Sequence, residues 1–122
     1  MRIDKDLVAA SATPLVLGIL VEGESYGYAI GKRVHELSQG RLAWTDGMLY
    51  PLLHRLERLG YVDAAWQVSE QGRRRKHYAI TGPGRDALGE QQRQWTAVTE
   101  TLDRLWRDGP APARAVSLGG AR

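Results

Sequence analysis

The stretch QGRRRKHYAITGPGR, residues 71–85, joins two halves with opposite physical demands. Its first half places four cations in a row, Arg73–Lys76, and its second half continues at once with Tyr78 and Ile80, which favour burial. A buried strand does not normally begin with four adjacent charges, and a solvated basic tail is not followed by apolar residues. We therefore expect a β-hairpin whose tip carries the cations and whose returning strand packs on a core.

The flanking residues complete this hairpin and start a helix. YVDAAWQV, residues 61–68, alternates well enough to predict the first strand, SEQG, residues 69–72, predicts the turn, and KHYAI predicts the returning strand. Thr81 then favours the N-cap position, with Pro83 inside the first turn. The sequence predicts one long final helix over residues 82–108.

Two amphipathic helices are expected in the first forty residues. Thr13 as N-cap and Pro14 as first helical residue predict the main body of the first helix, and residues 6–12 could form an earlier turn that leads into it. Ser25 predicts the cap of the second helix, and Gly40 predicts its end.

A third helix follows Thr45, which also favours the cap position. Gly60 predicts its end, and Pro51 is expected to bend the helix or shorten its first turn, because proline removes a backbone hydrogen bond. The apolar residues recur at the spacing of one helix face, which predicts a stripe turned towards the core: Leu49, Leu52, Leu53, Leu56 and Leu59.

This order of elements indicates a mainly α fold with a small β-hairpin, a winged helix-turn-helix followed by a long C-terminal dimerisation helix. We expect residues 1–81 to form the winged helix-turn-helix domain and residues 82–108 the dimerisation helix. Residues 109–122 are rich in Gly, Pro and Ala, and this composition predicts a disordered tail.

Composition narrows the class of protein. The chain has 122 residues, 43% of them apolar and 25% charged, which is typical of one globular domain. It contains no cysteine, which excludes disulfides and zinc sites that need sulfur. Its start does not resemble a signal peptide, and its longest apolar stretch is too short to cross a bilayer. We therefore expect a soluble cytoplasmic protein with no membrane partner.

The positive charge is focused at one place. The net charge is +3, and Arg73–Lys76 alone carries four positive charges, so the remainder is close to neutral. In a winged helix-turn-helix these cations would lie beside the sugar–phosphate backbone, and the polar face of the third helix would enter the major groove. Each group alone also fits a solvated surface, but together they predict binding to double-stranded DNA through Thr45, Tyr50, His54, Arg55, Arg58, Arg73, Arg74, Arg75 and Lys76.

The final helix carries an apolar seam with steps of seven, three, four and three residues, and the polar Gln91 at its weak position. The seam favours a homodimer, and the alternative is packing onto the first helix of the same chain. The residues predicted to mediate dimerisation are Leu88, Trp95, Val98, Leu102 and Leu105.

The four tryptophans are assigned three different roles. In a dimer, two copies of Trp95, with Val98 and Thr99, could bind a small planar aromatic effector between their indole rings. The alternative for Trp95 is ordinary packing within the seam. Trp66 and Trp106 are interpreted as packing residues, and Trp44 as a partner in a hydrophobic staple before the third helix.

Catalysis has little support in the sequence. His35, His54 and His77 fall on different predicted elements, and no serine or aspartate is placed to activate a nucleophile. The glycines around Pro83 form no nucleotide-binding motif. We expect no enzyme activity, no catalytic residues, no cofactor and no metal site.

Three segments carry a resemblance to a known family: PLVLGILVEGESYGYAI (residues 14–30), GMLYPLLHRLERLGYVDAAW (residues 47–66) and GRRRKHYAITGPGRDAL (residues 72–88). With these motifs at this spacing, the chain resembles the PadR family of transcriptional regulators. The resemblance implies a dimeric winged-helix repressor whose last helices form the dimer contact. It also implies that Tyr50 faces DNA and that the cations at the wing approach the backbone or the minor groove.

The segment RQWTAV around Trp95 is similar to multidrug-sensing members of that family, in which a tryptophan on the last helix lines a drug pocket at the dimer centre. The prediction is therefore a ligand-responsive, homodimeric, DNA-binding repressor. Two alternatives remain: a winged-helix interaction module whose basic wing binds an acidic protein partner, and an effector-binding scaffold with no role on DNA.

Overall fold

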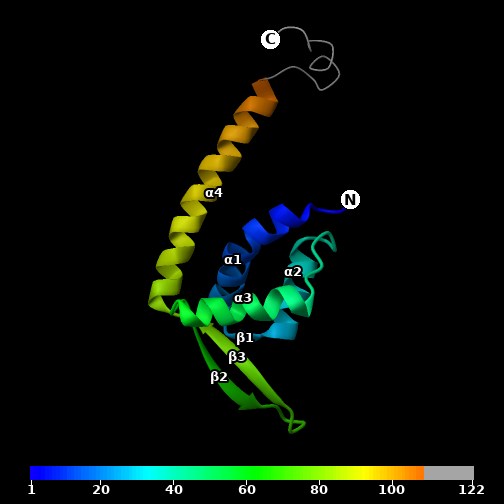
Figure 1. Cartoon of the computed structure of the whole chain (residues 1–122), viewed down its shortest axis with the longest axis vertical. Coiled ribbons are helices and arrows are strands. Elements are labelled where there is room, and N and C mark those ends of the chain that lie inside the picture. The colour runs from blue at the N-terminus through cyan, green and yellow to red at the C-terminus, as the bar shows by residue number, and fades with distance from the viewer. Residues whose placement is uncertain (109–122) are drawn as a thin grey trace. The chain divides into compact units, whose positions relative to one another are not determined.

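The computed structural model describes residues 1–108, and the predicted tail, residues 109–122, lies outside that part (Figure 1). The described chain is mainly helical, with a three-stranded antiparallel sheet in the order β1-β3-β2, which confirms the predicted fold class. The elements in chain order are α1 (Lys5–Val21), β1 (Ser25–Tyr26), α2 (Gly27–Leu37), α3 (Asp46–Arg58), β2 (Val62–Val68), β3 (Arg74–Ile80) and α4 (Gly82–Asp108).

The chain divides into two compact units, and the division falls inside α4. The first unit comprises residues 1–90, and the described part of the second is the helical segment 91–108. The division differs from the expected boundary at the start of α4, because Ala87 and Leu88 in the first turns of that helix pack with the core of the first unit.

α1 is longer than the sequence predicted, and the expected start at Pro14 is wrong. The helix begins at its N-cap, Asp4, whose side chain accepts a hydrogen bond from the backbone N–H two residues later (2.8 Å). It continues through Thr13 and Pro14 although proline lacks the backbone donor. The buried stripe runs across this position, with Ala12 on one side and Val16 on the other, so the packing holds the chain helical.

α2 starts later than predicted, because Ser25 is not its cap. Ser25 and Tyr26 form the short strand β1, which pairs with β3, and Tyr26 takes the N-cap position without a side-chain cap. The helix ends at Leu37, and Gly40 follows in the left-handed conformation (φ 81°). The glycine therefore ends the turn after the helix rather than the helix itself.

α3 begins and ends as predicted. The Thr45 hydroxyl accepts a backbone hydrogen bond in the first turn (3.3 Å). At the other end Gly60 adopts a left-handed φ of 80°, and the N–H of Tyr61 donates to the carbonyl of Leu56 (2.9 Å), which is the Schellman arrangement. Pro51 lies inside the helix and does not shorten it.

The wing is the hairpin of β2 and β3 (Figure 1). The two strands pair from Val62 with Ile80 to Val68 with Arg74, so the turn is residues 69–73. The prediction that the hairpin tip carries all four cations is wrong. Arg73 lies in the turn, and the next three cations lie on β3, because the strand pairing extends further towards the tip than the apolar residues alone indicated.

The core of the first unit joins all three N-terminal helices to the sheet. Tyr78 is 2% exposed and Ile80 packs at the edge of the core, which confirms that these residues seat the wing. Burial raises the pKa of the Tyr78 phenol. The largest fully buried side chains are Tyr78, Leu17, Leu20, Ile30, Leu53, Leu56, Val16, Val34 and Val62.

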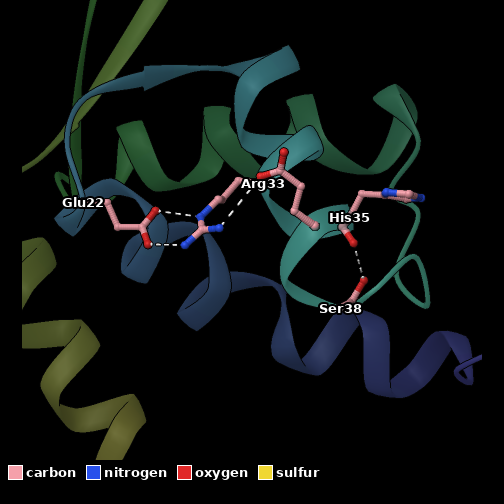
Figure 2. A network of polar contacts seen from close by, with 5 residues as sticks. Glu22, Arg33, His35 and Ser38 are labelled. Carbon is pink, nitrogen blue, oxygen red and sulfur yellow. Dashed lines mark hydrogen bonds and ion pairs between the residues drawn. The ribbon is translucent and has the colours of Figure 1, made fainter.

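An exposed ion pair links the end of α1 to α2. The Arg33 guanidinium donates to both carboxylate oxygens of Glu22 (Figure 2), with donor–acceptor distances of 3.0 and 2.8 Å. The third nitrogen of the same guanidinium lies 3.8 Å from a carboxylate oxygen of Glu36. These hydrogen bonds lower the pKa of the Glu22 carboxyl. One turn further, the Ser38 hydroxyl donates to the carbonyl of His35 (3.2 Å). The bidentate pair orients the turn that leads into β1.

The start of α4 packs tightly on the end of α3. The Thr81 hydroxyl accepts from the N–H of Gly84 (3.1 Å), which confirms Thr81 as the cap, and donates to the carbonyl of Gly60 (2.6 Å). A Cβ atom at Gly84 would overlap the backbone carbonyl oxygen of Tyr61 and approach Ile80 to 2.9 Å. The helix start therefore requires a glycine at this position.

We expect Gly84→Ala to lower the free energy of unfolding by about 1–3 kcal/mol, because the colliding atom belongs to the backbone and cannot rotate away. Thermal unfolding followed by circular dichroism measures the effect. The control is Gly18→Ala in α1, where the added Cβ meets nothing within 4 Å and should leave Tm unchanged or raise it. Equal Tm values for the two variants would contradict the proposed packing.

Candidate nucleic-acid interface

A hollow with a volume of about 460 Å³ lies between the wing and the start of α2. One residue of α3 also lines it. We call it the wing groove. None of its lining residues is acidic, whereas four are cationic and four are aromatic. They are Tyr26, Gly27, Tyr28, Tyr50, Trp66, Arg73, Arg74, Arg75 and Lys76.

Two guanidinium groups of the wing groove are stacked on aromatic rings. Strand alternation sends the side chains of Arg74 and Arg75 to opposite faces of β3. Arg74 lies 4.7 Å from the centre of the Trp66 ring, and Arg75 lies 4.5 Å from that of Tyr26. Neither forms an ion pair with any residue in the described part of the chain. Stacking thus orients both charges without neutralising them.

Lys76 differs from its neighbours because it has a carboxylate partner. Its Nζ lies 3.2 Å from Oε1 of Glu57 on α3 and 5.7 Å from the ring centre of Tyr78. The pair is partly buried, so it is screened less than a surface pair. Lys76 therefore links the wing to α3.

The predicted residues of α3 do not share one hollow. Tyr50 is 40% exposed and lines the wing groove. His54, Arg55 and Arg58 instead line a separate, open hollow of about 690 Å³ beside α1, where a guanidinium nitrogen of Arg55 donates to the Thr13 hydroxyl (3.4 Å). α3 thus presents one flank to the wing and another to α1.

Sequence reasoning missed several residues of the wing groove. Trp66 was interpreted as a packing residue, yet it is 59% exposed and supports Arg74. Tyr26 lies in β1 and Tyr28 is 72% exposed in the first turn of α2, and neither is among the predicted site residues. The YGY motif at residues 26–28 was the available signal. It places an aromatic side chain on either side of a glycine, which has no side chain of its own.

The helical segment of the second unit carries an exposed apolar stripe. Val98 and Leu105 are 52% and 64% exposed, and Trp95 and Leu102 are half-buried. The Thr99 hydroxyl donates to the carbonyl of Trp95 (2.8 Å).

The burial of Leu88 and Trp106 is the opposite of what the sequence predicts. Leu88 was expected in a seam between chains but lies in the core of its own chain, at 8% exposed. Trp106 was interpreted as packing but is 68% exposed in the described chain. Trp44 is partly buried against the core.

The described residues offer no grouping for metal chemistry. The three histidines lie on α2, α3 and β3, and residues 1–108 hold no cluster of three or more potential metal ligands. Nδ1 of His77 is buried without a hydrogen bond in this part of the chain, 3.8 Å from Glu24. No helix of residues 1–108 is both long and apolar enough to span a bilayer.

Known proteins share this sequence pattern and fold. Residues 16–90 match the model of the Transcriptional regulator PadR-like family. An uncharacterised protein of Lysinibacillus sphaericus is 27% identical over 104 residues, which cover 85% of this chain and 94% of that protein.

Two solved structures carry the same comparison further. A PadR-like transcriptional regulator from Bacillus cereus strain ATCC 14579 is 26% identical, with a TM-score of 0.74, over 86% of this chain and 99% of its own. A PadR family transcriptional regulator from Eggerthella lenta DSM 2243 is 29% identical, with a TM-score of 0.73, over 85% of this chain and 88% of its own.

The family match spans more than half of the chain and includes α2, α3 and the whole wing. It confirms the resemblance drawn from the three sequence segments, and it confirms that the chain is a regulator and not an enzyme. This protein belongs to the PadR-like family of transcriptional regulators.

Proposed function

We propose that this protein is a ligand-responsive repressor that binds double-stranded DNA as a homodimer. Regulators of this family bind DNA, typically as dimers. The observation that carries the proposal for this chain is the wing groove, which is lined by Tyr50 of α3 and by two stacked guanidinium groups that have no acidic partner among the described residues. Such a surface fits a polyanion whose bases lie next to its phosphates.

The wing supplies the phosphate contacts in this proposal. Arg73, Arg74 and Arg75 have no acidic partner among the described residues, so a phosphate would be their first counter-charge. Stacking restricts Arg74 and Arg75 before binding, which lowers the entropy lost on association.

α3 supplies the sequence-dependent contacts. Tyr50 and His54 are one turn apart and exposed, and they would approach the base edges, with Thr45 near the N-terminal end of the helix. Arg55 and Arg58 would contact phosphates on the flank beside α1. Lys76 would set the angle between the wing and α3 through Glu57.

The proposed dimer forms through the second unit. Trp95, Val98, Leu102 and Leu105 lie on one side of α4, and the exposure of Val98 and Leu105 supports this seam. Leu88 takes no part, because it is already buried in its own chain. Two-fold symmetry would then present two wing grooves to one duplex.

The proposed effector site is the pair of Trp95 side chains, with Val98 and Thr99 beside them. Two indole rings near a two-fold axis would offer flat faces to a planar aromatic molecule. Binding releases DNA if the ligand favours a dimer state in which the two wing grooves no longer fit the duplex.

Removing the stacked cations should weaken binding to every DNA sequence. We expect Arg74→Ala with Arg75→Ala to flatten the slope of log K against log salt by about 0.9 per lost phosphate contact, about 1.8 in total. Fluorescence anisotropy over a salt series, with duplex from upstream of the coding region and with random duplex, measures the slope. Arg85→Ala, an exposed arginine outside the wing groove, is the control. An unchanged slope would remove the wing from the interface.

The same DNA titrations, with one titration of an acidic peptide added, distinguish a DNA-binding regulator from a module that binds an acidic protein. A DNA-binding regulator prefers its upstream duplex over random duplex of equal length and charge. Equal, weak binding to both duplexes, together with tight binding to an acidic peptide, would favour the protein-interaction module.

A charge in the proposed seam should dissociate the dimer. We expect Val98→Asp to raise the monomer–dimer dissociation constant at least about tenfold, because each dimer would bury two unpaired carboxylates. Thr96→Asp is the control, since Thr96 lies about 200° around the helix from Val98. Sedimentation velocity at micromolar concentration measures the effect. A wild-type protein that sediments as one chain would end the dimer proposal.

The effector proposal predicts quenching that depends on Trp95. Titration with planar aromatic dyes should quench tryptophan emission in the wild type, and Trp95→Leu should abolish the quenching. Trp106→Leu should retain it, because Trp106 lies about 16 Å further along the helix. If no dye in a broad panel gives quenching that depends on Trp95, this residue is a packing residue of the seam.

A further inference from the structure

Gly27, the first residue of α2, is buried beneath the side chain of Tyr50. A Cβ atom built at Gly27 would lie 2.6 Å from Cε1 and 2.7 Å from Cζ of the Tyr50 ring, and closer still to its hydroxyl oxygen. These distances are well inside van der Waals contact. The ring of Tyr50 can therefore occupy its place only because residue 27 has no side chain.

Backbone conformation does not explain this glycine. Gly27 does not adopt a positive φ, whereas Gly40 and Gly60 do. A glycine in a helix costs about 1 kcal/mol relative to alanine. The neighbouring glycine of the same helix, Gly31, is different, since its Cβ would approach Leu49 only to 3.9 Å, an ordinary contact. Residue 27 is therefore a glycine because the Tyr50 ring occupies the space of a side chain, and not because the backbone requires a glycine there.

The position of the ring matters because Tyr50 joins α3 to the wing groove. The side chain starts from α3, crosses to the first turn of α2 and lines the groove together with Arg74 and Arg75. It remains 40% exposed. Contact with α2 on one side restricts the orientations of the phenol, and its exposed side stays open to a bound duplex.

We propose that Gly27 is a positioning residue for DNA recognition, because it provides the space that holds the Tyr50 ring and hydroxyl at the wing groove. The inference rests on the proposed function, and it adds a residue that does not itself need to touch DNA. Alanine at position 27 would displace the ring, and the groove would lose a preordered contact while its cations stayed in place.

The fold should tolerate this displacement. The atoms that a new Cβ would meet belong to the free end of the Tyr50 side chain, which can rotate away. The contrast is Gly84, where the colliding atom is a backbone carbonyl oxygen. Gly27→Ala should therefore separate DNA affinity from stability, which a purely structural glycine would not do.

The test compares Gly27→Ala with Gly31→Ala, the same exchange one turn later in α2. We expect Gly27→Ala to weaken binding to the upstream duplex at least about tenfold, roughly 1.4 kcal/mol, and Gly31→Ala to change it less than about twofold. Tm should not fall in either variant, because both gain helix propensity. Anisotropy titrations at one salt concentration and thermal unfolding give the two readouts.

A double-mutant cycle with Tyr50→Ala tests whether Gly27→Ala weakens DNA binding through the Tyr50 ring. Tyr50→Ala should weaken binding by at least as much as Gly27→Ala, and adding Gly27→Ala to it should change affinity less than about twofold. In the free wild-type protein, an NMR cross-peak between the Tyr50 ring protons and the Gly27 α-protons should be present. The corresponding cross-peak to residue 27 should be absent in Gly27→Ala.

The outcomes distinguish this inference from the proposed function. Wild-type affinity in Tyr50→Ala would remove Tyr50 from the interface and with it the proposed role of α3. A weakened Tyr50→Ala with an unaffected Gly27→Ala would overturn the inference alone. A further loss when Gly27→Ala is added to Tyr50→Ala would also overturn it, because the effect would not act through the ring.

Discussion

The pairing register of β2 with β3 is the constraint on which the interface depends. Val62 and Tyr78, at one end of the hairpin, are buried in the core and fix this register. Because side chains alternate along a strand, the same register decides which face of the wing each cation occupies. A slip by one residue would exchange the faces of Arg74 and Arg75 and separate both from their aromatic partners.

In the wing groove, two arginine side chains are held in place without losing their N–H donors to carboxylates. Adjacent cations repel one another, and a protein commonly relieves this with carboxylates, which would also occupy the donors. Here Arg74 and Arg75 are relieved by stacking on Trp66 and Tyr26, and their N–H groups remain open. Aromatic faces attract a cation without competing for a phosphate, so orientation is achieved with the positive field intact.

Much of the fold followed from local sequence signals. Thr45, Gly60 and Thr81 mark helix ends through their own side chains or backbone conformations, and the structure has helix ends at these places. Ser25 did not behave in this way, because an edge of β3 was available and tertiary pairing with it prevailed over a local cap. Local signals decide an element end only where no partner competes.

The site was harder to predict than the fold. The sequence identified the cations and Tyr50, but Tyr26 and Gly27 enter the groove through contacts with segments far apart in the chain, and Trp66 enters it through the pairing of the hairpin strands. The Trp66–Arg74 contact depends on the length of the turn, and the Tyr50–Gly27 contact depends on how α3 crosses α2. Such distances between elements leave no periodic trace in one sequence.

The partly buried pair of Lys76 and Glu57 has an electrostatic consequence of its own. Glu57 places a carboxylate on the flank of α3 that faces the wing, close to where the proposed phosphates would run. Lys76 masks this charge from an approaching polyanion. In the proposed complex, a neutral side chain in place of Lys76 would remove an attraction for phosphate and expose the charge of Glu57, so the lysine would shield the DNA from this carboxylate as well as contact it.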